Sequence, residues 1–202
     1  MAPVFAGRFV LDVDGIALFM ALCILGGGLM QWPIGWLSDK YDRRTVLTIA
    51  LFIAGGMAIV IATVGIMRPE YLLYIAFVYG AASFPLYALT VSHANDYVET
   101  DERVVVSGTL LLTYGTGAII GPVLAGPIMV ELGVAGLFYY IGGVFIIVGI
   151  YALWRMTRRA APPLSEQNKF VPTPGSTPVA GELDPQAEAD SDAPTPPPVE
   201  RV

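Results

Sequence analysis

Five long runs of uncharged, mostly apolar residues dominate the chain: residues 15–37, 45–67, 71–92, 104–130 and 132–154. A helix needs about 20 residues to cross roughly 30 Å of hydrocarbon, and each run reaches that length. Within lipid, a segment must satisfy its own backbone hydrogen bonds, which an α-helix does. The sequence therefore predicts an all-α membrane protein with five transmembrane helices.

The composition agrees with this fold class, since 55% of the residues are hydrophobic, 14% are charged and the mean hydropathy is +0.64. The net charge is −6, but residues 161–202 hold seven acidic side chains against Lys169 and Arg201, so the acidity belongs mainly to this end. Nucleic acid is not an expected partner. Short connections predict antiparallel neighbours, and neighbouring helices should absorb the kinks at Pro33, Pro85, Pro122 and Pro127.

The basic residues predict the orientation, because lysine and arginine concentrate in short cytoplasmic loops. Seven fall at one end of the spans and two at the other. The first group is Lys40, Arg43, Arg44, Arg103, Arg155, Arg158 and Arg159, and the second is Arg8 and Arg68. We therefore expect a multi-pass protein of the plasma membrane, the inner membrane in a bacterium, with residues 1–14 outside. Residues 160–202, rich in proline and acidic side chains, are predicted to be a disordered cytoplasmic tail.

The segment "GWLSDKYDRRTVL", residues 35–47, concentrates charge between the first two spans, and we call it the charged loop. Composition alone favours a solvated turn. The order of its residues is more specific and resembles the signature G-x-L-[A/S]-D-[R/K]-x-G-R-[R/K]-x-x-L of the major facilitator superfamily. Asp42 stands where that signature has its second glycine. The matching positions are Gly35, Leu37, Ser38, Asp39, Lys40, Arg43, Arg44 and Leu47.

This resemblance implies that the five spans are helices eight to twelve, in the C-terminal half of a transporter of the YcaD-like branch. Residues 1–14 would then be the exit of helix seven and its external loop. The implied function is alternating-access transport of a small solute of unknown identity, with the N-terminal half and the lipid bilayer as partners. The resemblance also makes Asp39 a latch on the N-terminus of a helix in the opposite half, with Arg43 and Arg44 holding the loop.

Polar residues in the spans suggest a solute cavity, because polar side chains avoid lipid. Gln31, Ser83, Tyr87 and Thr113 are the candidate lining residues, although hydroxyls also bond to their own helix and tyrosines anchor at the membrane interface. A second pattern of small residues predicts close helix packing. It comprises Gly117, Gly121, Pro122 and Gly126.

Two other functions are compatible with parts of the sequence. Ser92, His93 and Asp96 invite a hydrolase, but neighbouring residues of a helix point about 100° apart, so we predict no enzyme and instead a His93–Asp96 contact. The main rival to a transporter is a five-helix scaffold whose tail recruits partners. The sequence predicts no metal site and no cofactor. His93, Asp96 and Glu131 are the candidates for a titrating group.

Overall fold

The computed structural model describes residues 13–98, 103–158 and 170, and every regular element within them is a helix. The elements are α2 (Val13–Lys40), α3 (Arg43–Met67), η1 (Pro69–Tyr71), α4 (Leu72–Ser83), α5 (Pro85–Asn95), α6 (Arg103–Leu132) and α7 (Gly136–Arg158). Five helical stretches are long and apolar enough to cross a membrane, with α4 and α5 together forming one of them. The predicted fold class is confirmed.

Prolines have different effects in different helices. Pro33, Pro122 and Pro127 lie inside unbroken helices. Pro85 instead separates α4 from α5, because its ring excludes the carbonyl one turn earlier and its nitrogen cannot donate. The predicted span 71–92 is therefore two helices in series.

The last two spans meet slightly later than the sequence predicted. Glu131 lies inside α6, and the turn follows at Gly133, whose φ of +69° is the left-handed conformation that glycine adopts after a helix end. The predicted tail, residues 160–202, and the predicted external segment, residues 1–14, lie outside the described residues except for Val13, Asp14 and Phe170.

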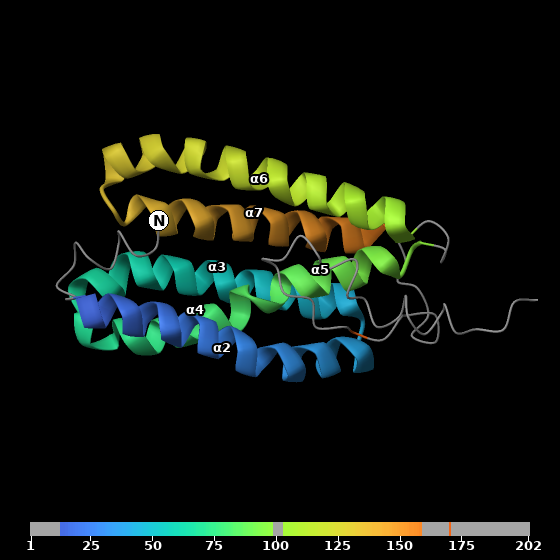
Figure 1. The fold of residues 1–202 in the computed structure, drawn as a ribbon, viewed down its shortest axis with the longest axis horizontal. Helices are drawn as coiled ribbons and strands as arrows, with labels where there is room; N and C mark the ends of the chain where they lie inside the picture. Colours follow the sequence, from blue (N-terminus) through green and yellow to red (C-terminus); the bar gives the residue numbers. More distant parts are fainter. Residues whose placement is uncertain (1–12, 99–102, 159–169, 171–202) are drawn as a thin grey trace, which may run out of the picture.

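The helices form an antiparallel bundle in which α4 packs on α2 and α3, while α7 packs between α3 and α6 (Figure 1). The buried core joins Phe19 of α2, Ile61 of α3, Leu72 of α4 and Phe138 of α7. A second buried cluster lies nearer the charged loop, where Val46 and Leu51 of α3 meet Leu89 of α5. Helix α6 is the least buried of the membrane-length helices.

The closest helix contacts involve glycines that the sequence analysis did not single out. A Cβ added at Gly80 would lie 2.0 Å from the carbonyl oxygen of Cys23, and one added at Gly26 would lie 2.2 Å from that of Phe77. Gly55 and Gly142 bring α3 and α7 together in the same way. Small residues thus allow these backbones to approach closely.

The predicted packing glycines of α6 behave differently. Among the described residues, nothing lies within 4 Å of a Cβ added at Gly117, Gly121 or Gly126, and the nearby Pro122 is exposed. The bundle is therefore not held together at these positions. A packing role for them remains a proposal that requires another partner.

The basic residues of the described helices gather at one end of the bundle. This end contains the last turn of α2, the starts of α3 and α6, and the last turns of α5 and α7 (Figure 1). Arg68 lies at the opposite end, after α3. The grouping that the sequence predicted is thus present for these residues, whereas Arg8 and Arg159 lie outside the described part of the chain.

Candidate functional site

The charged loop makes a tight turn from α2 into α3 with its own polar groups. The side chain of Asp42 accepts a hydrogen bond of 3.0 Å from the backbone N–H of Arg44 and so caps the start of α3. The hydroxyl of Ser38, fully buried, donates to the carbonyl oxygen of Gly35 at 2.9 Å. The residue that departs from the signature, Asp42, therefore has a defined role as a helix cap.

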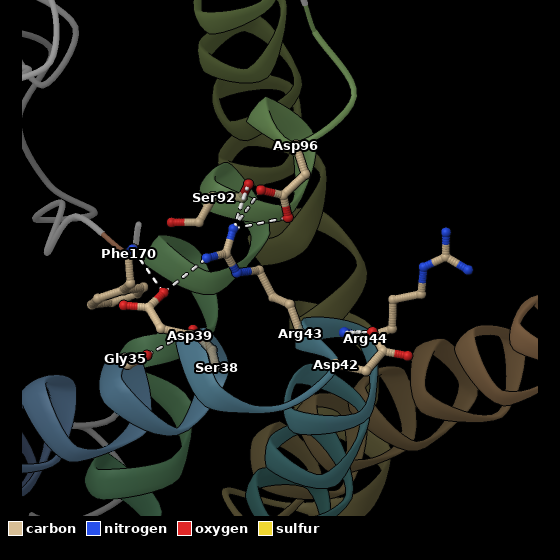
Figure 2. A network of polar contacts seen from close by, with 9 residues as sticks. All are labelled: Gly35, Ser38, Asp39, Asp42, Arg43, Arg44, Ser92, Asp96 and Phe170. Carbon is tan, nitrogen blue, oxygen red and sulfur yellow. Dashed lines mark hydrogen bonds and ion pairs between the residues drawn. The ribbon is translucent and has the colours of Figure 1, made fainter. Parts of the chain in front are cut away.

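Arg43 is the centre of the site, and its side chain is only 1% exposed. Its Nη1 lies 2.8 Å from both carboxylate oxygens of Asp96 and 3.0 Å from the carbonyl oxygen of Ser92. Its Nη2 lies 3.1 Å from Oδ1 of Asp39. Figure 2 shows the guanidinium reaching from the start of α3 to the end of α5, between the two carboxylates.

The environment of Arg43 explains how a cation can be buried. The two carboxylates of Asp39 and Asp96 balance its charge, and the Ser92 carbonyl belongs to the last turn of α5, where the helix dipole is negative. Burial of an unpaired guanidinium would cost several kcal/mol. The network therefore ties three helix ends together through one side chain, and removal of Arg43 itself should disturb all three.

Asp39 differs from Asp96 in its access to solvent, with a side chain 36% exposed against 2%. Its Oδ1 also accepts a hydrogen bond of 2.8 Å from the backbone N–H of Phe170 (Figure 2). The Phe170 ring lies over Gly35, so that a Cβ added there would come within 2.2 Å of it. A single oxygen of Asp39, Oδ1, thus accepts hydrogen bonds both from Arg43 and from the backbone of a distant segment.

The remaining basic residues of the loop point elsewhere. The ammonium of Lys40 lies over the Trp36 ring, 4.9 Å from its centroid. The guanidinium of Arg44 contacts the hydroxyl of Tyr97 and lies 5.6 Å from the centroid of that ring. Figure 2 shows Arg44 on the other side of the turn from the Arg43 network. Of the two leucines of the predicted signature, Leu37 is exposed and Leu47 is partly buried against the second core cluster.

The end of α5 has a structural role that the hydrolase interpretation did not anticipate. Asp96 binds Arg43, the Ser92 carbonyl accepts from the same guanidinium, and His93 contacts the Tyr97 ring edge-on with centroids 5.3 Å apart. The expected His93–Asp96 contact stays a prediction. Among the described residues, no group of three or more His, Cys, Asp and Glu side chains could hold a metal ion.

The candidate cavity residues lie on four helices, which belong to three membrane-length spans. Gln31 is half-buried in α2, Ser83 and Tyr87 flank the break between α4 and α5, and Thr113 is exposed on α6. The ring of Tyr87 packs edge-on against Tyr114, which links α5 to α6. Thr113 donates to the Thr109 carbonyl at 2.8 Å, as threonines in membrane helices often do. Lining of a solute cavity by these residues remains a prediction.

Sequence reasoning missed two parts of the site. An aspartate directly before an apolar helix is a common cap, and this signal would have identified Asp42. The pairing of Arg43 with Asp96 spans 53 positions and has no local signal.

Comparisons with known proteins place these features in context. A family model described as Major Facilitator Superfamily matches residues 1–189. No solved structure gives a match.

Several curated proteins are similar to the chain. An uncharacterized MFS-type transporter of Yersinia enterocolitica, YE1530, is 26% identical over 80% of the chain and 41% of its own length. Proteins named uncharacterized MFS-type transporter YcaD are 29% identical over 73% of the chain in Escherichia coli and 34% identical over 65% in Salmonella arizonae. The chain covers 37% and 33% of these two relatives, so it spans well under half of their length.

Proposed function

The chain belongs to the major facilitator superfamily, and on that basis we propose that it forms part of the C-terminal half of a secondary transporter. Transporters of this kind move a solute by rocking two helical bundles about a site near the middle of the membrane. The five membrane-length helices would supply one side of the path, with Gln31, Ser83, Tyr87 and Thr113 facing the solute. A second bundle, equivalent to the N-terminal half, is the proposed partner.

The observation that carries the proposal is the geometry of Asp39. Arg43 holds one oxygen of this carboxylate, yet the side chain stays partly exposed and accepts the backbone N–H of Phe170. The N-terminus of a helix presents the same kind of donor, an unsatisfied backbone N–H with a positive dipole. This geometry supports a latch in which Asp39 receives a helix N-terminus from the opposite bundle.

The orientation proposed from the basic residues places this latch on the cytoplasmic side. Lys40, Arg44 and Arg158 all lie at the charged-loop end. Contact there would hold the cytoplasmic side closed and favour the outward-open state. Release of Asp39 would accompany opening toward the cytoplasm.

The test uses a chimera, because the substrate is unknown and conformation can be measured directly. The matching segment of full-length Escherichia coli YcaD is replaced by this chain, and spin labels are placed on the cytoplasmic ends of the two halves. We expect two distances whose populations change with Asp39→Asn. A latch of about 1–2 kcal/mol would shift their ratio by roughly 5–30 fold toward the inward-open state.

Lys40→Gln is the matched control, since Lys40 lies in the same loop but contacts Trp36. It should leave the ratio unchanged. A single distance in every variant would contradict alternating access. An unchanged ratio in Asp39→Asn would contradict the latch alone.

A further inference from the structure

A cavity of about 450 Å³ lies between α3, α5, α6 and α7 at the charged-loop end of the bundle. Its polar lining comes from Arg44, Thr48, His93, Tyr97 and Arg155, and much of the remaining wall is apolar, including Leu47 and Val106. It is separate from the Arg43 network, because Arg44 lies on the other side of the turn (Figure 2). The proposed solute path does not use it.

The ends of the membrane-length helices place this cavity near the expected boundary between headgroups and hydrocarbon. Arg44 is the second residue of α3, His93 is in the last turn of α5, and Arg155 is in the last turn of α7. Since these helices match the thickness of the hydrocarbon layer, their ends lie near the lipid phosphates. A ligand in this cavity would meet charge on one side and acyl chains on the other.

The charge of the cavity favours an anion. Two guanidinium groups line it, and no aspartate or glutamate is among the described residues of its wall. The Tyr97 hydroxyl adds a further polar group.

The apolar wall narrows the choice of anion. A free phosphate ion would neutralise the arginines but would leave the apolar wall in contact with water. A phosphate attached to an acyl chain satisfies both surfaces, and basic pockets between membrane helices suit anionic headgroups. We propose that this cavity binds an anionic phospholipid, with its phosphate held by Arg44 and Arg155 and its first methylenes along the apolar wall.

The experiment measures lipid binding to the purified chain by native mass spectrometry in a neutral detergent. Phosphatidylglycerol should bind about tenfold more tightly than phosphatidylcholine, because each basic residue near the surface attracts anionic lipid. Arg155→Gln and Arg44→Gln should each weaken phosphatidylglycerol binding about fivefold. Arg155→Lys, which keeps the charge, should retain most of the affinity.

Arg158→Gln is the control for non-specific attraction. Arg158 lies on the same helix, contacts the Trp154 ring and does not line the cavity. Its loss should leave binding unchanged. Arg155 is exposed, so its substitution should not unfold the chain. Circular dichroism of each variant tests whether the helices remain folded.

A soluble competitor distinguishes recognition of the whole lipid from recognition of its phosphate alone. Glycerol 3-phosphate at millimolar concentration should not displace phosphatidylglycerol, because it lacks the acyl chains that meet the apolar wall. Displacement would mean that the cavity recognises phosphate alone and would overturn the lipid assignment. Equal affinity for the two lipids, or an Arg158→Gln effect as large as that of Arg155→Gln, would overturn the site itself.

Discussion

The two ends of the helix bundle each pair an arginine with a carboxylate, yet in opposite surroundings. At the charged-loop end, Arg43 and Asp96 are 1% and 2% exposed and lie 2.8 Å apart. At the other end, Arg68 and Glu70 are 69% and 55% exposed, with 3.5 Å between them. Loss of the ion pair should therefore strongly destabilise the fold at the charged-loop end and have almost no effect at the other end, because water screens only the second pair.

The largest expected difference between the two ends is their access from outside the cell. With Cys23 replaced by alanine, cysteines at Lys40 and Arg158 should be shielded from an impermeant thiol reagent, whereas a cysteine at Glu70 should be labelled. The reason is the concentration of lysine and arginine at the charged-loop end. Labelling of intact cells measures this. A labelled Lys40 position with a shielded Glu70 position would reverse the proposed orientation.

Loss of the buried carboxylate should be the largest effect on stability. Asp96→Ala leaves a buried guanidinium with one partner fewer and should lower the free energy of unfolding by about 3–5 kcal/mol. Reversible unfolding in mixed micelles measures the change. The double variant Arg43→Met with Asp96→Leu should recover most of the loss, since it removes the buried charges together. If the double variant is as unstable as Asp96→Ala alone, packing at this site is responsible and not charge.

An intermediate effect is expected at Asp39, which shares Arg43 but is partly exposed. Asp39→Asn should lower the free energy of unfolding of this chain by about 1 kcal/mol or less, because Asp96 still pairs with Arg43 and solvent screens the exposed carboxylate. The same unfolding assay measures it. A loss of stability as large as that in Asp96→Ala would show that the two carboxylates are equivalent. Burial would then not explain the difference between them.

The smallest effect belongs to the opposite end of the bundle. Glu70→Gln should change the free energy of unfolding by no more than about 0.5 kcal/mol, because exposed ion pairs rarely contribute more. High salt should leave even this difference unmeasurable. A destabilisation of several kcal/mol would mean that Glu70 has a partner beyond Arg68, and the contrast between the two ends would lose its basis.

The site shows which features of a membrane protein can be predicted from its sequence. The charged loop, its signature residues and the grouping of basic side chains at one end were predicted from residues close together in the chain. The close contacts of Gly26 with α4 and of Gly80 with α2 were not, and the predicted glycines of α6 proved to have no helix against them in the described part of the chain. The spacing of small residues predicts that a helix can pack closely against another helix, but it does not predict which helix that is.

The sequence by itself determined the number of spans and their approximate ends, because apolar length and terminal charge act through the lipid and need no partner within the protein. The order of residues in the charged loop indicated the family. Only the tertiary structure decided that Arg43 would be buried against Asp96 while Arg44 turns toward Tyr97. The two arginines are adjacent and chemically identical. Helices that are apolar on every side carry little information about their rotation, so the choice between such neighbours depends on how the helices pack.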